Sequence, residues 1–181
     1  PKMENAEVAD LMARFEPLVK HFNRYLTIGG FPELALSDDD LYAQRMLRED
    51  VVDKVIKRDV LTLFKVRSPL LMEKLFLYLC MNSTEIFSAT TAAKELDNIS
   101  PNTIESYVDA LVKSNLIYMA YPIAVGSKSV LKGRPKIYIA DAAIRNAVLM
   151  VDDVLSDERE LGLLIETTVY KHLVSFYQGT G

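Results

Sequence analysis

The fold is decided at residues 68–121, which read SPLLMEKLFLYLCMNSTEIFSATTAAKELDNISPNTIESYVDALVKSNLIYMAY. Ser68 and Pro69 predict a helix start, because proline at the first helical position lacks only an N–H that would have no partner there. The apolar side chains that follow recur at helical spacing, so one face of this helix is expected to be buried. They are Leu71, Leu75, Phe76, Leu79 and Cys80.

Two further helices are expected within the same stretch. A short one should run from Thr90 to Leu96, and a turn at 97–99 separates it from a third helix that Ser100 and Pro101 open. The third helix has the apolar spacing of an amphipathic helix, with Asn115 as its expected C-cap. Its apolar positions are Ile104, Tyr107, Val108, Leu111 and Val112.

Two β-forming segments come next. Residues 116–121 are rich in β-formers and residues 136–140 alternate in a similar way, with glycine and proline in the loop between them. Helix, short helix, turn, helix and β-hairpin is the order of a winged helix. The sequence therefore predicts a mainly α-helical chain with a winged-helix unit at its centre.

The segment before this unit is also helical in pattern. Residues 4–26 predict two helices broken near Pro17, and the glycines and proline at 29–32 end the second one. At least one of these glycines is expected at positive φ, which glycine tolerates without a Cβ clash. A further helix should start at Ser37, before three aspartates that suit a helix N-terminus, and end within residues 58–64.

The C-terminal part predicts a short helix at 141–150 and a longer one at 157–176. The apolar positions of the longer helix repeat at helical spacing, so we expect one of its faces to lie against a core. These positions are Leu161, Leu164, Ile165, Thr168, Val169, His172 and Leu173.

Length and composition are those of an ordinary globular chain. Half of the 181 residues are hydrophobic and a quarter are charged, which argues against disorder. No apolar run is long enough to cross a bilayer, and no signal peptide opens the sequence. The single cysteine, Cys80, cannot form an internal disulfide and is expected in the core. These features predict a cytoplasmic protein without a membrane partner.

The net charge of −4 argues against a dedicated nucleic-acid protein, but the charge is uneven. Residues 122–140 are basic and hold no acidic side chain. The candidate DNA- or partner-binding residues of this wing are Lys128, Lys132, Arg134 and Lys136. The third helix offers Asn102 and Thr103 near its start but also carries Glu105 and Asp109, which would repel phosphates. Weak, salt-sensitive DNA contact through the wing and docking to protein both remain open.

No complete catalytic or metal site is evident in the sequence. It contains no Walker-type phosphate loop, and His21 and His172 have no ligand partner at metal-binding spacing. Glu166 lies within an apolar helical stripe and is expected at the boundary of a core. We therefore expect no enzymatic activity, metal or cofactor in this chain.

Several strings occur in a fixed order. They are GGFPE at 29–33, KRDV at 57–60, the winged-helix pattern, PKIYIAD at 135–141 and LGLLIE at 161–166. Together they resemble the C-terminal half of prokaryotic P-loop ATPases of the AAA_14 type, including their DUF4143 region. The resemblance covers about residues 20–175. Its motif residues here are Gly29, Gly30, Pro32, Arg58, Asp59, Asp141 and Glu166.

The resemblance implies an ATPase domain upstream, which would use ATP and Mg²⁺ in the parent and serve as a docking partner. It divides the chain into a helical lid-like segment at 1–67, a winged-helix domain at 68–141 and helices at 142–181. The last part would begin a truncated restriction-endonuclease-like module, in which Glu166 matches the glutamate of PD-(D/E)xK nucleases. Residues 142–144 are Ala-Ala-Ile where the family usually has x-Gly-Leu, so the family's backbone geometry there does not carry over.

The leading interpretation is a non-catalytic C-terminal fragment of such an ATPase. Its winged helix would contact DNA, dock on the parent's own ATPase domain or bind another protein. The start at Pro-Lys-Met and the stop just after a helix favour a piece of a longer protein. One alternative is a stand-alone winged-helix transcriptional regulator, which would need a more basic third helix. The other is a fragment of a PD-(D/E)xK-type nuclease, which the truncation disfavours.

Overall fold

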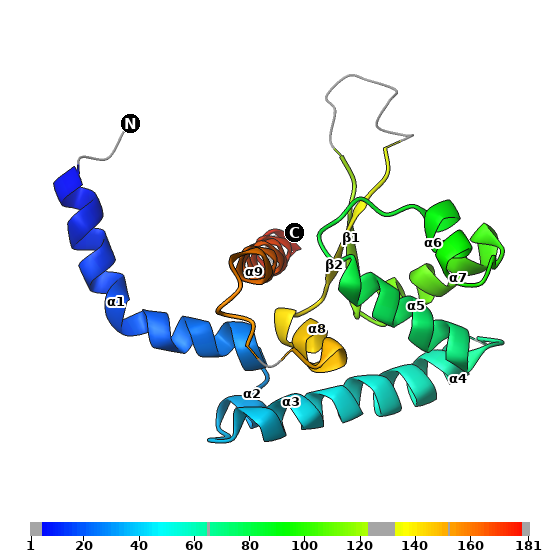
Figure 1. Ribbon diagram of the computed structural model, residues 1–181, viewed down its shortest axis with the longest axis horizontal. Helices are drawn as coiled ribbons and strands as arrows, with labels where there is room; N and C mark the ends of the chain where they lie inside the picture. The colour runs from blue at the N-terminus through cyan, green and yellow to red at the C-terminus, as the bar shows by residue number, and fades with distance from the viewer. Residues whose placement is uncertain (1–4, 65, 123–132, 152, 179–181) are drawn as a thin grey trace.

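The computed structural model describes residues 5–64, 66–122, 133–151 and 153–178. The chain is mainly α-helical with one small antiparallel sheet, as the sequence predicts. Three consecutive elements form a long rod along the lower edge of Figure 1: α3 (Asp40–Arg48), the π-helical η1 (Glu49–Val60) and α4 (Leu61–Leu63). Helices α5 (Pro69–Met81) and α8 (Ala142–Leu149) lie against this rod.

Helix α1 (Asn5–Ile28) is continuous where two helices were predicted. Pro17 lies inside it, and the helix changes direction about halfway along its length (Figure 1). A proline in a helix interior removes one backbone hydrogen bond and crowds the preceding turn, so it bends a helix without having to end it. The predicted break is therefore a bend.

A tight turn at Gly29 ends α1 and leads into α2 (Pro32–Ala35), with Pro32 at its first position. Gly29 has φ +77°, which confirms the prediction of a glycine at positive φ. A Cβ at Gly29 would lie 2.8 Å from Oδ1 of Asp141, so this position also has no room for a side chain. The turn thus depends on glycine for both its backbone conformation and its close approach to Asp141.

The start of α3 differs from the prediction. Asp39 caps the helix, because its carboxylate accepts a hydrogen bond from the N–H of Tyr42 at 2.9 Å, whereas Ser37 was expected in that role. Either residue type can cap, and the local backbone decides between them. The predicted extension toward Phe64 is confirmed, but the π-helical stretch η1 was not predicted.

The centre contains α5 (Pro69–Met81), α6 (Ala89–Glu95) and α7 (Pro101–Lys113). Ser68 caps α5 as predicted, and Ser88 caps α6. Ser100 precedes α7 without a side-chain cap, and its carbonyl accepts from the N–H of Ile104 at 3.2 Å instead. Asn115 follows α7 in the left-handed conformation expected of a residue that ends a helix.

Strand β1 (Ile117–Ala120) pairs antiparallel with β2 (Lys136–Ile139), with Ile117 opposite Ile139. The segment at 84–87 lies along the other side of β2. The N–H of Thr84 donates to the carbonyl of Ile137 at 2.7 Å, and that of Phe87 donates to Pro135 at 2.8 Å. This third extended segment was not predicted from the sequence.

One hydrophobic core joins the rod, α5, α6, α7, the sheet and α8 (Ala142–Leu149). Phe76 is 1% exposed, and Cys80 is fully buried as predicted, so burial raises the pKa of its thiol. The same core contains Val60 and Ala147, which lie beyond the predicted domain boundaries at 67/68 and 141/142. Those boundaries stay a prediction.

Helix α9 (Glu158–Gln178) buries only part of its predicted inner face. Leu164 and Thr168 are buried against the end of α1, α8 and β2, whereas Val169 is 52% exposed and Leu173 is 49% exposed. The prediction of a fully covered face is therefore wrong, because α9 extends past the elements that cover its first half. No described helix combines the length and apolar character needed to cross a bilayer.

Candidate functional site

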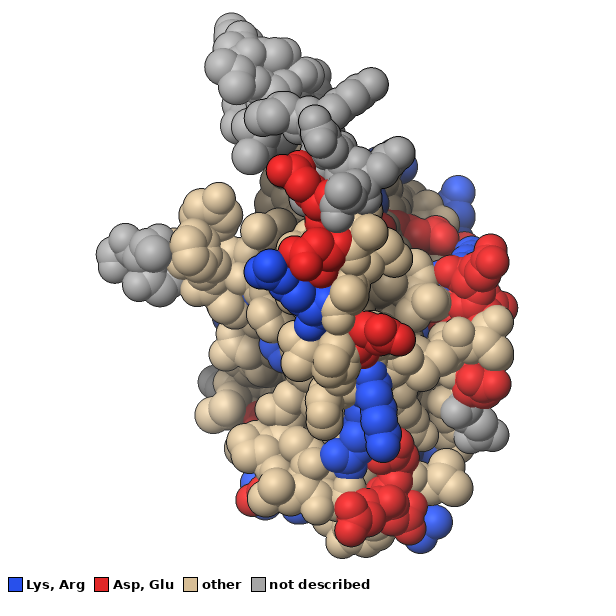
Figure 2. Space-filling view, turned by 90° about the vertical axis from the view of Figure 1, so that its left-hand side faces the viewer, with Lys and Arg blue, Asp and Glu red and all other residues tan. Residues whose placement is uncertain are grey.

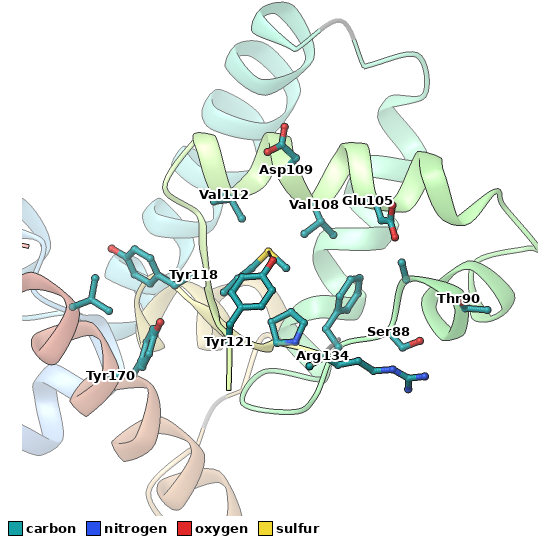
Figure 3. A pocket seen from close by; sticks show the side chains of 16 residues that line it. Ser88, Thr90, Glu105, Val108, Asp109, Val112, Tyr118, Tyr121, Arg134 and Tyr170 are labelled. Atoms are coloured by element: carbon teal, nitrogen blue, oxygen red, sulfur yellow. Dashed lines mark hydrogen bonds between the residues drawn. The ribbon is translucent and has the colours of Figure 1, made fainter. Parts of the chain in front are cut away.

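A groove of about 790 Å³ lies between α7, the strands at the base of the hairpin and α9 (Figure 3). The N-terminus of α6 closes one end of it, where Ser88 and Thr90 lie. Tyr118 and Tyr170 lie at the opposite end, and Tyr121 lies between the two ends. The groove thus has a polar end, an aromatic end and a tyrosine in the middle.

Helix α7 forms one wall of the groove. Val108 and Val112 point toward the cavity, one turn apart on the same helix face (Figure 3). Glu105 and Asp109 also line the groove from α7. Nζ of Lys113 lies 2.6 Å from Oδ2 of Asp109, and both side chains are more than half exposed. This wall therefore combines apolar side chains with two carboxylates, one of which pairs with Lys113.

Tyrosines form the opposite wall. The rings of Tyr138 and Tyr170 are stacked with their centroids 4.0 Å apart, and the ring of Tyr118 lies 6.2 Å from that of Tyr170. Burial raises the pKa of Tyr170, and the neighbouring Tyr118 raises it further. Tyr121 is 59% exposed. The neutral form of Tyr170 is therefore favoured, and its ring lines the groove together with those of Tyr118 and Tyr121.

Glu166 is held at the outer edge of this wall. It accepts hydrogen bonds from Nζ of Lys136 at 3.0 Å and from the hydroxyl of Tyr138 at 2.8 Å. Burial by itself would raise the pKa of Glu166, but the hydrogen bonds from Lys136 and Tyr138 and the charge of Lys136 outweigh it, so its pKa lies below the ordinary value. Glu166 thus ties α9 to β2, in agreement with the predicted boundary position.

The predicted wing residues are only partly brought to the groove. Arg134 lines it, whereas Lys136 is paired with Glu166. Lys128 and Lys132 lie outside the described residues. Asn102 is exposed and Thr103 is half-buried on the first turn of α7, and neither lines the groove.

A second cluster brings two of the motif residues, Gly29 and Asp141, to the place where α1, α8 and α9 meet. Asp141 is 4% exposed and caps α8, because its Oδ1 accepts from the N–H of Ala143 at 2.9 Å. Nζ of Lys171 donates to Oδ2 of Asp141 and contacts the hydroxyl of Tyr25 at 3.3 Å. Gly29 packs directly on this carboxylate. The cluster attaches the outer helices to the centre.

The other motif residues lie apart from this cluster. Arg58 and Asp59 pair with each other through Nε and Oδ1 at 2.9 Å on the rod, and Gly30 is exposed beside Tyr25. Pro32 opens α2. No three His, Cys, Asp or Glu side chains within the described ranges are gathered as metal ligands. The motif residues therefore do not converge on one site.

Sequence reasoning missed the groove tyrosines and Lys171. A weak signal existed for Tyr118 and Tyr121, which lie at the end of a β-forming run, although their spacing of three places them on opposite faces of an extended strand. Tyr170 and Lys171 gave no such signal, because their partners Tyr138 and Asp141 are about thirty residues away in sequence.

Comparison with known proteins finds relatives in an archaeon. It is 25% identical over 160 residues to the uncharacterized protein MJ1544 of Methanocaldococcus jannaschii, covering 86% of this chain and 34% of that protein. It is 30% identical over 167 residues to the uncharacterized protein MJ1637 of the same organism, covering 91% of this chain and 34% of the relative. The chain thus spans about a third of the length of these relatives. No solved structure matches it.

The matching family model corrects the resemblance drawn from the sequence strings. It covers residues 19–155 and is not that of the DUF4143 region of AAA_14-type ATPases. Short strings such as GGFPE are compatible with many helical turns, so their order was not specific enough to identify the family. The ATPase parent, with its ATP and Mg²⁺, followed only from that resemblance and loses its basis. The chain belongs to the family described as Domain of unknown function (DUF8612).

Proposed function

We propose that residues 68–141 form a winged helix that docks a segment of another protein in the groove beside α7. The order of α5, α6, α7 and the β1–β2 pair agrees with this fold, and the segment at 84–87 supplies the extra strand beside β2 that winged helices carry. On this interpretation α7 is the third helix of the unit, the one that DNA-binding relatives of the fold insert into the major groove.

The lining of the groove is the observation that carries the proposal. A helix that reads DNA presents donors and cations to base edges and phosphates. Here α7 presents Glu105 and Asp109, and Asp109 takes up the charge of Lys113. Carboxylates on this surface would repel the phosphate backbone at close range. Of the described hairpin cations, Arg134 lines the groove, whereas Lys136 is engaged by Glu166.

The same lining suits a protein segment. Val112 and Met119 are half-buried and offer apolar contact area beside the buried Val108, and the tyrosines offer rings with a polar tip, as the centres of protein interfaces commonly do. An amphipathic helix that lays its apolar face in such a groove is an established mode of peptide recognition. The polar positions at the rim would then fix its orientation.

Fluorescence anisotropy with two labelled probes tests the proposal. One probe is an amphipathic helical peptide of leucine, alanine and arginine, and the other is a DNA duplex, of which several unrelated sequences are compared. We expect the peptide to bind and the duplexes to bind weakly or not at all. Val112→Glu should weaken peptide binding by about tenfold or more, because it places a charge among the apolar side chains of this wall.

Leu70→Glu is the matched control, since Leu70 is 64% exposed on α5 and does not line the groove. It should bind the peptide like the wild-type chain. Tight duplex binding that discriminates between sequences would instead assign α7 to base reading and overturn the proposal. Duplex binding that depends only on salt and on Arg134 and Lys136 would favour the wing contact with DNA that the sequence left open.

A further inference from the structure

At the centre of the groove, Tyr121 and the α7 side chains Val108 and Val112 lie on opposite sides of the cavity (Figure 3). Tyr121 lies across the cavity from α7, and its ring is 59% exposed (Figure 3). Glu105 lies on the α7 side, on the same helix face as Val108, and Asp109 follows it by one turn. An occupant of the groove would therefore pass between an aromatic ring and a carboxylate-bearing helix.

The described side chains that line the groove include more acidic than basic groups. Glu105 and Asp109 contribute two carboxylates, and Arg134 contributes one guanidinium. Glu105 makes no ion pair with any of the described side chains. The pair between Asp109 and Lys113 is exposed, and exposed ion pairs add little stability. A cation on a bound segment can therefore replace Lys113 as the partner of Asp109. The α7 wall is thus complementary to a positive group.

We infer that the segment docked in this groove carries an arginine, whose guanidinium is seated over the Tyr121 ring and pairs with Glu105 and Asp109. This inference rests on the proposed protein-docking function and names the chemistry of the partner. Arginine fits better than lysine, because its planar guanidinium stacks on an aromatic ring and donates to carboxylates through a fork of N–H groups. The leucine side of the segment would cover Val112 and Met119.

Anisotropy with three versions of one capped amphipathic peptide tests the inference. The peptides differ only at a central position that holds arginine, lysine or citrulline, the last of which keeps the shape of arginine without its charge. We expect the wild-type chain to bind the arginine peptide about tenfold more tightly than the citrulline peptide, with the lysine peptide between them. Raising the salt concentration should reduce this difference.

Protein variants locate the effect. In the double variant Glu105→Gln, Asp109→Asn, the preference for arginine over citrulline should fall to about twofold or less. Tyr121→Leu should reduce it by about threefold, since it removes the ring and keeps apolar volume. Glu33→Gln removes an exposed carboxylate on α2, away from the groove, and should leave the preference unchanged.

The outcomes separate this inference from the function on which it rests. If all three peptides bind equally and Val112→Glu still abolishes binding, the groove docks protein, but the proposed arginine contact with Tyr121, Glu105 and Asp109 is wrong. If none of the peptides binds, the proposed protein docking and the proposed arginine contact are both wrong. An arginine preference that survives in the Glu105→Gln, Asp109→Asn variant would place the cation elsewhere and overturn the inference.

Discussion

The central core and the first helix carry the same kind of apolar stripe and differ in what lies against it. On α5, Phe76 and Leu79 are each 1% exposed. On α1, Phe15 is 55% exposed and Leu18 is 53% exposed, although their helical spacing is equally regular. Spacing therefore identifies a face that can be buried, and only the fold decides whether something covers it.

The outer region defined by α1 and the second half of α9 leaves much of its apolar surface in water. Figure 2 looks at the side of the molecule that carries α1 and shows broad uncharged areas with acidic and basic side chains scattered between them. The exposed large side chains of α1 are Val8, Leu11, Met12, Phe15, Leu18, Val19 and Phe22, and those of α9 are Ile165, Val169, Leu173, Phe176 and Tyr177. The two regions should respond very differently to the loss of one apolar side chain.

The largest expected effect compares two phenylalanines. Phe76→Ala should lower the free energy of unfolding by about 3–5 kcal/mol, because it opens a cavity in the core. Phe15→Ala should change it by no more than about 0.5 kcal/mol, because the side chain is already exposed. Urea unfolding followed by circular dichroism measures both values. A loss of several kcal/mol for Phe15→Ala would mean that α1 is covered in solution, and the contrast between the regions would disappear.

The next effect concerns the turn that attaches α1 to the centre. Gly29→Ala should destabilise the chain by at least about 1–2 kcal/mol, because φ is positive there and the added Cβ would meet Asp141. Gly162→Ala on α9 is the matched control, since its Cβ would meet no atom within 4 Å. It should raise stability by about 0.5–1 kcal/mol through helix propensity. Thermal unfolding measures both changes in stability. If both substitutions stabilise the chain, or both destabilise it, this account of the turn is wrong.

A smaller effect tests the pair that joins α9 to α8. Asp141→Asn keeps a side chain able to cap α8 but removes the charge that Lys171 contacts, so we expect a loss of about 1–2 kcal/mol. Asp39→Asn makes the same change at the exposed cap of α3 and should cost about 0.5 kcal/mol or less. The comparison uses urea midpoints at neutral pH. A similar loss for both variants would show that the pair with Lys171 contributes little.

The smallest effect concerns Glu166, which ties α9 to the sheet. Its pKa is lower in the folded chain than the ordinary value of 4.5, so its contribution is present above pH 4.5 and is lost as pH falls through the folded pKa. The side chain is exposed, so Glu166→Gln should cost no more than about 1 kcal/mol at neutral pH. Melting temperatures of the two proteins should differ by a constant amount above pH 4.5 and converge below it. A difference that grows in acid would reverse the sign of this linkage.

The sequence was informative about the fold wherever the signal is local. Proline at the first turn, a preceding serine or aspartate and left-handed asparagine or glycine mark helix ends through backbone chemistry alone. Ser68–Pro69, Gly29 and Asn115 therefore lie where the sequence placed them. The bend at Pro17 and the cap at Asp39 differ from prediction because a proline and a serine each permit more than one local outcome.

The groove was predictable only in part. The acidic character of α7 follows from Glu105 and Asp109, which the sequence shows directly. The aromatic wall does not, because Tyr170 reaches Tyr138 and Tyr118 only after α9 has packed on the sheet. The sequence predicts Lys136 as a DNA- or partner-binding residue of the wing, and its pairing with Glu166 depends on the same packing.

By itself, then, the sequence indicated the order of the helices around the hairpin and the start of α5 at Ser68–Pro69, because these follow from spacing and from backbone chemistry within a few residues. The tertiary structure alone decided which apolar faces are covered, the contact between Gly29, Asp141 and Lys171, and the meeting of Tyr118, Tyr138 and Tyr170 beside α7. Burial and ion pairing are properties of two surfaces in contact, and a pattern along one chain describes only one of them.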